Sequence, residues 1–178
     1  VELLFLYKQQ ILGRLEYRTA AVYHAADTVL QPLDAAQRRV VKAAGMTEFE
    51  ALMVSRLAPL GTRRDIAMLG ILHRQVLGLG PKALNTLVAL STSRPQRHTR
   101  LGANRHKLQL TSKLEASAHD YLRRSIVGAI EIYNLLPVRI VETAHTVAKF
   151  QSLLQELVME RACQGCTDWP DTLSPRVL

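Results

Sequence analysis

The stretch 57–78, LAPLGTRRDIAMLGILHRQVLG, contains both a start and a stop signal for an α-helix. Thr62 is a favourable N-cap residue, and Asp65 stands three positions later, where a capping-box carboxylate would lie. Gly78 suits the left-handed conformation that ends a helix, and Pro81 follows just beyond it. The predicted apolar face consists of Ile66, Leu69, Val76 and Leu77. We therefore expect a helix over 62–77.

Two arginines, Arg63 and Arg64, occupy the predicted first turn of this helix. The helix dipole favours acidic residues at that end, so their charge is placed unfavourably. Two interpretations remain open. The arginines either face a phosphate at the mouth of the helix, or they are ordinary solvated side chains.

The composition is that of a globular protein. Apolar residues make up 48% of the 178 positions, which is enough for one domain or for two small helical subdomains. Aromatic residues make up only 5%, which argues against a surface that stacks single-stranded bases. No apolar run approaches the roughly 18 residues of a membrane span, so we expect no membrane contact.

The first residues, VELLFLYKQQ, lack the basic region and the cleavage site of a signal peptide. Two cysteines, Cys163 and Cys166, are too few for a secreted disulfide framework. We expect an intracellular protein, in the nucleus or the cytoplasm. The sequence also lacks an initiator methionine, and we interpret it as a part of a longer protein.

The positive charge is concentrated in one segment. Residues 66–114 contain no Asp or Glu but eight cations, which equal the whole net charge of +8. These cations are Arg74, Lys82, Arg94, Arg97, Arg100, Arg105, Lys107 and Lys113. Such a distribution indicates a polyanionic partner, either nucleic acid or an acidic surface. A solvated loop that keeps the chain soluble is the alternative.

Helical signals surround the segment 57–78 on its N-terminal side. Residues 3–26 are apolar on most faces, which predicts a buried central helix that Gly13 bends or splits. A second helix is expected to open at Pro32 and to stop at Gly45, and a third is expected to run from Thr47 to about Ser55. A further helix is predicted over 81–90.

The pattern changes after residue 90. Residues 91–113 mix basic residues with Ser, Thr, Pro, Gly and Asn, which predicts a loop with a short extended piece at HKLQL, 106–110. Residues 121–137 fit a helix or a strand. The spacing of Val147, Phe150, Leu154 and Leu157 predicts a helix from Thr146 to about Arg161. We expect a mostly α-helical fold: an irregular helical bundle (1–90), a basic loop (91–113) and a smaller helical tail (114–178).

No catalytic machinery is evident. The six aspartates are scattered along the chain, unlike the clustered carboxylates that hold two divalent ions in a polymerase. The CQGC motif at 163–166 has the spacing of half a zinc site, but no second half follows. His73 is expected to be a hydrogen-bonded core residue, whereas His98 and His106 could add charge to the basic loop. We predict no catalytic residue, no bound metal and no cofactor.

Four stretches, in order, resemble the region downstream of the palm in reverse transcriptases of non-LTR (LINE-type) retrotransposons. The first two are LYKQQILGRLEYRTAAVYHA, 6–25, which looks like the family's "LY…LEYgspvW", and LDAAQRRVVKAAG, 33–45, which is similar to "LexvQrrflRxixG". The opening stretch resembles "LPPLxxRRxxxxLxxLyKxlxG". Finally, IYNLLPVRIVETAHTVAKFQSLL, 132–154, resembles "xWNsLPxxivxaxsvxxFkxxL". Departures are Tyr133 in place of the Trp and Tyr23 near a second Trp position.

The resemblance implies the thumb and C-terminal tail of an RNA-directed DNA polymerase, without its Asp-Asp active site. A thumb binds the template–primer duplex through backbone phosphates, which requires Arg and Lys but no base contacts. The implied partners are RNA or an RNA–DNA hybrid, and the upstream palm of the same parent protein. The candidate nucleic-acid-binding residues are Arg38, Arg39, Arg63, Arg64, Arg94, Arg97, Arg100, Arg105 and Lys107. A helical module with an acidic protein partner, and a decayed element with no selected function, are the alternatives.

Overall fold

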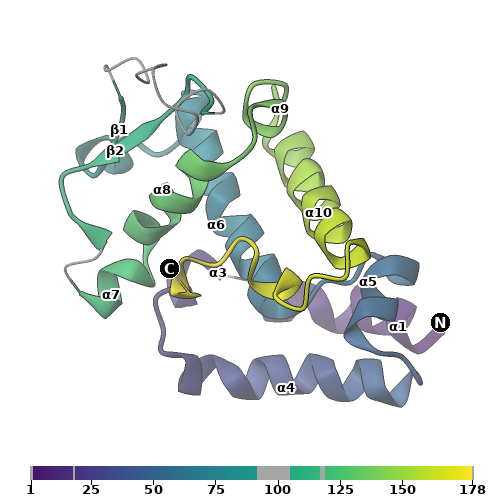
Figure 1. Cartoon of the computed structure of the whole chain (residues 1–178). Coiled ribbons are helices and arrows are strands. Elements are labelled where there is room, and N and C mark those ends of the chain that lie inside the picture. The colour runs from purple at the N-terminus through teal and green to yellow at the C-terminus, as the bar shows by residue number, and fades with distance from the viewer. Residues whose placement is uncertain (1, 18, 92–104, 117–118, 178) are drawn as a thin grey trace.

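The computed structural model describes residues 2–17, 19–91, 105–116 and 119–177 (Figure 1). It confirms the mostly helical fold and adds one two-stranded antiparallel sheet. In chain order the elements are α1 (Glu2–Tyr7), the π-helical turn η1 (Lys8–Leu12), α2 (Gly13–Glu16), α3 (Thr19–Val22), α4 (Asp27–Ala43), α5 (Glu48–Ser55), α6 (Leu60–Val76), the 3-10 helix η2 (Lys82–Thr86), β1 (Val88–Leu90), β2 (Leu110–Ser112), α7 (Asp120–Arg123), α8 (Ile126–Leu135), α9 (Val138–Val141), α10 (Val147–Cys163) and the 3-10 helices η5 (Trp169–Asp171) and η6 (Pro175–Val177).

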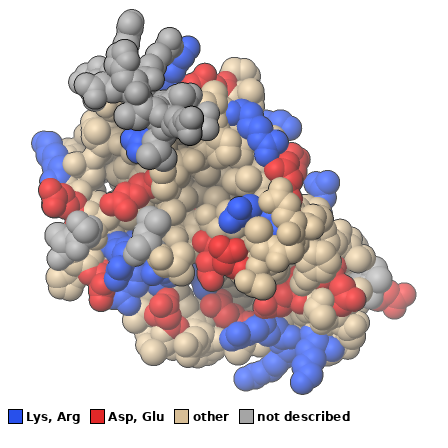
Figure 2. All heavy atoms as spheres, viewed as in Figure 1, with Lys and Arg blue, Asp and Glu red and all other residues tan. Residues whose placement is uncertain are grey.

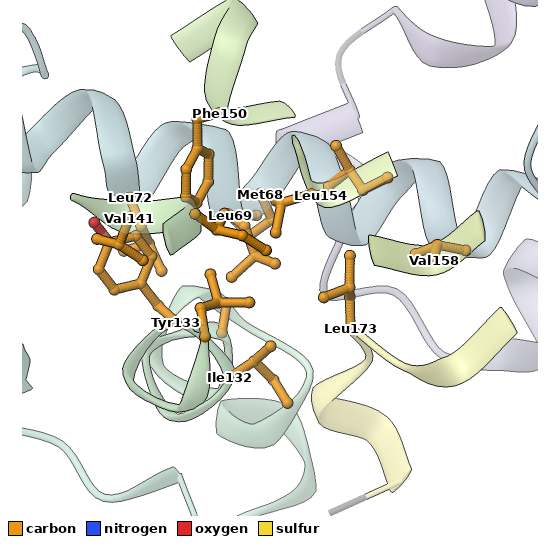
Figure 3. Close-up of a cluster of buried hydrophobic side chains, with 14 of the residues drawn as sticks. Met68, Leu69, Leu72, Ile132, Tyr133, Val141, Phe150, Leu154, Val158 and Leu173 are labelled. Carbon is orange, nitrogen blue, oxygen red and sulfur yellow. The ribbon is translucent and has the colours of Figure 1, made fainter. Parts of the chain in front are cut away.

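The central element is α6, the helix of the quoted stretch. It packs against α10, α8, α3 and α4, and most of its side chains are buried (Figure 1). The buried surface of α6 is therefore wider than the single apolar face predicted from the sequence. Leu72 of α6, Tyr133 of α8 and Phe150 of α10 point toward one another in the main hydrophobic core (Figure 3). That core extends to Leu173 near the C-terminus.

The prediction of a buried central helix over 3–26 is wrong. This region is divided among α1, η1, α2 and α3, and its buried apolar residues are Leu4, Tyr7 and Leu12 in one cluster and Tyr23 in another. Phe5 and Leu6 remain 62% and 56% exposed. The apolar residues on most faces of 3–26 predicted burial, but many of them are exposed to solvent.

Gly78 ends α6 as predicted. Its φ is +74°, and the amide of Leu79 donates to the carbonyl of Arg74 across the turn at 3.0 Å. The same motif closes α10, where Gly165 has a φ of +75° and the amide of Cys166 donates to the carbonyl of Arg161. The glycine inside CQGC is therefore a helix stop.

The helix starts differ from the predictions in two of three cases. Thr47 caps α5 through a complete capping box with Glu50, as expected. Thr62 does not cap α6, because that helix already begins at Leu60, and the Thr62 hydroxyl donates to the carbonyl of Pro170 at 2.7 Å instead. The second helix, α4, opens at Asp27 and contains Pro32 within it.

The region around the sheet also departs from expectation. The predicted helix over 81–90 is a 3-10 turn followed by β1, whose Ala89 pairs with Thr111 of β2. The extended piece begins at Leu110, the last residue of the expected 106–110 stretch. The ambiguous stretch 121–137 is helical, and α10 lies where a helix was predicted. Buried residues of α8, α9 and α10 share one core with α6.

Candidate nucleic-acid interface

The outer face of α4 carries two of the predicted binding residues, Arg38 and Arg39, in exposed positions. Arg38, Arg39 and Lys42 are exposed and form no ion pair within the described residues. The opposite face of the helix is held by Val41 in the core and by Gln37, whose amide donates to the carbonyl of Ala58 at 2.9 Å. Basic side chains gather along the lower edge of the molecule in Figure 2, where α4 lies. Because one side of α4 is held against the core, the cations on its other side face the solvent.

A groove of about 640 Å³ adjoins this cationic face. Arg38 and Arg39 line it, together with Leu60, Gly61 and Thr62 from the first turn of α6. No side chain caps that turn, so the positive end of the helix dipole faces the groove. The acidic residues at the groove are Asp34, Glu48 and Asp171.

Arg63 and Arg64 are engaged inside the fold. Arg63 pairs with Glu16 of α2, and Arg64 forms a two-pronged ion pair with Asp34 of α4, with both N–O distances at 2.8 Å. The side chain of Arg64 is only 11% exposed. Because α6 begins at Leu60, both arginines lie beyond Leu60, Gly61 and Thr62, and each forms an ion pair, which neither sequence interpretation anticipated.

Of the remaining predicted cations, the two that the structure describes, Arg105 and Lys107, lie away from α4. Arg105 forms a β-bridge with Pro137, and the amide of Lys107 donates to Glu142 at 2.8 Å; both side chains are exposed. This region adjoins the sheet, opposite α4 in Figure 1. The structure therefore separates these two from Arg38 and Arg39. Arg94, Arg97, Arg100 and His98 lie outside the described residues.

His73 and His106 are both fully buried. His73 is hydrogen-bonded within the core, as predicted. His106 was expected to be able to add charge to the basic loop, and this expectation is wrong. Its Nε2 donates to the carbonyl of Tyr133 at 2.9 Å, and burial lowers its pKa, so the ring is neutral near pH 7.

Sequence reasoning missed a buried polar cluster beside the groove. The hydroxyl of Tyr23 donates to Asp65 Oδ1 at 2.8 Å, and Arg176 lies against the Tyr23 ring at 5.6 Å from its centroid. The cluster surrounds a cavity of about 260 Å³, which four aspartates line: Asp27, Asp34, Asp65 and Asp171. These aspartates are far apart in the sequence, so spacing gave no signal. The one available clue was Asp65, the only acidic residue of α6.

No group of three or more His, Cys, Asp or Glu side chains in the described ranges could hold a metal ion. The aspartates of the cavity are engaged with other groups: Asp27 with Arg176 and Asp34 with Arg64. In CQGC, the thiol of Cys163 lies 3.7 Å from the sulfur of Met53.

No helix in the described part of the chain is long and apolar enough to cross a membrane. No protein-family model, curated protein or solved structure matches this chain.

Proposed function

We propose that this chain is a non-catalytic part of a retrotransposon-type reverse transcriptase that contacts the phosphate backbone of RNA or of an RNA–DNA hybrid. The proposal combines the sequence resemblance with the cationic face of α4. Arg38 and Arg39 are the primary contacts. The polymerase Asp-Asp site belongs to an upstream palm that this resemblance implies, so catalysis is not assigned to these residues.

The observation that carries the proposal is the state of the α4 cations. Arg38, Arg39 and Lys42 are exposed and without an intramolecular ion pair in the described structure, and Arg38 and Arg39 line the groove at the start of α6, which no side chain caps. Unpaired arginines and free helix N–H groups are both suited to phosphate oxygens. Arg63 and Arg64, which are already paired, are positioning residues in this proposal.

The polar residues that carry the resemblance have partners in the fold. Glu16 pairs with Arg63, Gln37 accepts from the hydroxyl of Tyr7 at 3.2 Å, and the amide side chain of Asn134 pairs with both backbone groups of Leu110 at 2.8 Å. Of these contacts, Glu16–Arg63 and Tyr7–Gln37 each join two different stretches of the resemblance.

The test is a fluorescence anisotropy titration of the full chain with an RNA–DNA hybrid at about 50 and 200 mM salt. For phosphate binding, the affinity falls steeply with salt, and the double variant Arg38→Gln/Arg39→Gln lowers the salt slope by about 2. The matched control is Arg14→Gln/Lys149→Gln, which removes the same charge from exposed residues of α2 and α10. If both double variants lost the same affinity for the hybrid, the loss would reflect the net charge of the protein and would contradict a binding site on α4.

The basic loop requires its own variant. Replacing Arg94, Arg97, Arg100 and Arg105 by Ala tests whether the second cationic region also contacts the duplex. Arg105 pairs with Pro137, which lies between α8 and α9, and α9 is at the opposite end of the molecule from α4 (Figure 1). We therefore expect the two sets of variants to act additively if one long duplex contacts both. Full binding by the quadruple variant would remove the loop from the interface.

A protein contact is the second candidate, and the exposed apolar residues of α1 favour it. Phe5 and Leu6 are 62% and 56% exposed on adjacent positions, beyond the face that packs on α4. The upstream palm implied by the resemblance is the partner that we propose for this face. If Phe5→Ser/Leu6→Ser leaves hybrid binding intact but weakens association with a separately expressed palm, the two surfaces are independent. If palm association is unchanged, α1 is not the contact.

A further inference from the structure

The last described segment of the chain, Trp169–Val177, crosses the molecule as a strap. Trp169 and Leu173 insert into the main core, and the carbonyl of Pro170 accepts a hydrogen bond from the hydroxyl of Thr62. Near its end, Arg176 binds the carbonyl oxygens of Tyr23 and Ala25 and the carboxylate of Asp27. The strap is thus fastened at both ends to α6 and to the chain between α3 and α4.

Asp65 lies beneath this strap. It is 4% exposed, and it lines the cavity of about 260 Å³ whose other wall includes Ser174 and Arg176 of the strap. The hydroxyl of Tyr23 is its hydrogen-bond donor. Opening the strap would expose this carboxyl group to water, because the strap forms one wall of the cavity.

Several charged groups face Asp65 from the surrounding elements. Arg176 and Asp171 come from the strap, and Arg64 comes from α6 itself. Asp27 and Asp34 line the same cavity from α4, each paired with one of these arginines. The arginines and the Tyr23 hydrogen bond favour the carboxylate, while Asp171 opposes it.

We propose that Trp169–Val177 is a proton-linked strap, which is closed over Asp65 while this carboxyl group is protonated and is loosened when the carboxylate forms. The cavity, the two-ended fastening and the buried carboxyl group carry the proposal, and it does not depend on the proposed function. Pro170 and Asp171 of the strap also line the α4 groove, so loosening the strap changes that surface as well.

The direction follows from the environment of the carboxyl group. Burial raises the pKa of Asp65 to about 7 in the closed form, whereas a hydrated aspartate titrates near its model value of 3.8. The open form therefore loses its proton at a lower pH than the closed form. The ratio of open to closed molecules rises up to about tenfold per pH unit between these two values, and it levels off above the higher one.

The chain contains a single tryptophan, and it lies in the strap. Acrylamide quenching of Trp169 fluorescence in the full chain, between about pH 5 and 8.5, measures strap opening directly. We expect quenching to increase with pH and to level off above about 7. Asp65→Asn, which is neutral at every pH, is expected to abolish this rise. The matched control Asp168→Asn removes an exposed carboxylate next to Trp169 and is expected to keep it.

A second variant and a second signal make the test decisive. Tyr23→Phe removes a hydrogen bond that favours the carboxylate, so the plateau moves to higher pH. Far-ultraviolet circular dichroism is recorded in parallel and is expected to stay constant. If the rise persists in Asp65→Asn, if wild-type quenching is flat, or if helicity falls together with Trp169 burial, the strap proposal is wrong.

Discussion

The hydroxyl of Tyr133 lies 3.0 Å from Nδ1 of His73 inside the main core, and Nε2 of the same ring lies 2.8 Å from the carbonyl oxygen of Ala144. A carbonyl oxygen only accepts, so Nε2 carries the proton and Nδ1 accepts from the Tyr133 hydroxyl. The imidazole also stacks on Phe150 with 4.0 Å between ring centroids. This arrangement satisfies a neutral histidine, and a second proton on Nδ1 would replace the hydrogen bond that the Tyr133 hydroxyl donates.

The first prediction concerns the pH dependence of stability. Burial lowers the pKa values of His73 and His106 in the folded chain, so the unfolded chain binds more protons below its ordinary value near 6.5. The free energy of unfolding is therefore expected to be fully retained above about pH 6.5 and to decrease as the pH falls below it. Urea unfolding at a series of pH values measures this dependence.

The raised pKa of Asp65 acts in the opposite sense, since its contribution is lost as the pH rises toward 7. The effect of the buried histidines on the free energy of unfolding is therefore best measured in an Asp65→Asn background, where the contribution of the Asp65 carboxyl group is absent. Replacing the exposed His145 by Gln in that background should leave the slope unchanged. A flat profile between about pH 6.5 and 5 would contradict the assignment of two neutral buried histidines.

The second prediction concerns Asn134, whose side chain pairs with both backbone groups of Leu110 next to the sheet. Asn134→Leu has similar size but leaves a partly buried N–H and C=O without partners, so we expect a loss of about 1–3 kcal/mol in the free energy of unfolding. Thr86→Val, at an exposed hydroxyl, is the control and is expected to change little. A negligible loss for Asn134→Leu would mean that water replaces the amide.

Local signals in the sequence predicted the parts of the fold that depend on neighbouring residues. The capping box at Thr47, the stop at Gly78 and the helix from Val147 all depend on contacts within one or two turns. The failures involve distant partners. Thr62 looks like a cap locally, but its hydroxyl is used by Pro170, 108 residues further on.

The candidate site was less predictable for the same reason. Adjacent arginines look alike in a sequence, yet Arg38 is exposed and unpaired in the described structure while Arg64 is held by Asp34 from 30 positions away. Only the positions of the aspartates in space distinguish them. The buried cluster around Asp65 has residues from α4, α6, the strap and the segment between α3 and α4, so no local window contained it.

The third prediction compares two glycines in helices. A Cβ at Gly128 would lie 2.0 Å from the backbone oxygen of Arg123, which cannot move aside, so Gly128→Ala is expected to destabilise the chain by more than about 2 kcal/mol. Gly13 has a helical φ of −61° and nothing within 4 Å of its Cβ position. Gly13→Ala is expected to stabilise by about 0.5–1 kcal/mol. Thermal and urea unfolding measure both, and a reversed order would contradict the packing at α8.

The last prediction separates structural from binding arginines. Arg64→Met removes the two-pronged pair with Asp34, whose partners are 11% and 30% exposed, and we expect a loss of about 1–3 kcal/mol in unfolding free energy. Arg38→Met is expected to stay within about 0.5 kcal/mol of wild type, because its side chain is exposed and unpaired in the described structure. A double-mutant cycle with Asp34→Asn isolates the pair energy.

Hybrid binding by the same two variants completes the comparison. Arg38→Met should weaken binding without changing stability, since a phosphate contact is lost from a surface that the fold does not need. Arg64→Met should weaken binding only as far as the fold is loosened, and Arg64→Lys should recover part of the stability but not the two-pronged geometry. If a fully folded Arg64 variant loses as much affinity as Arg38→Met, then Arg64 contacts the duplex directly, and its pairing with Asp34 must open on binding.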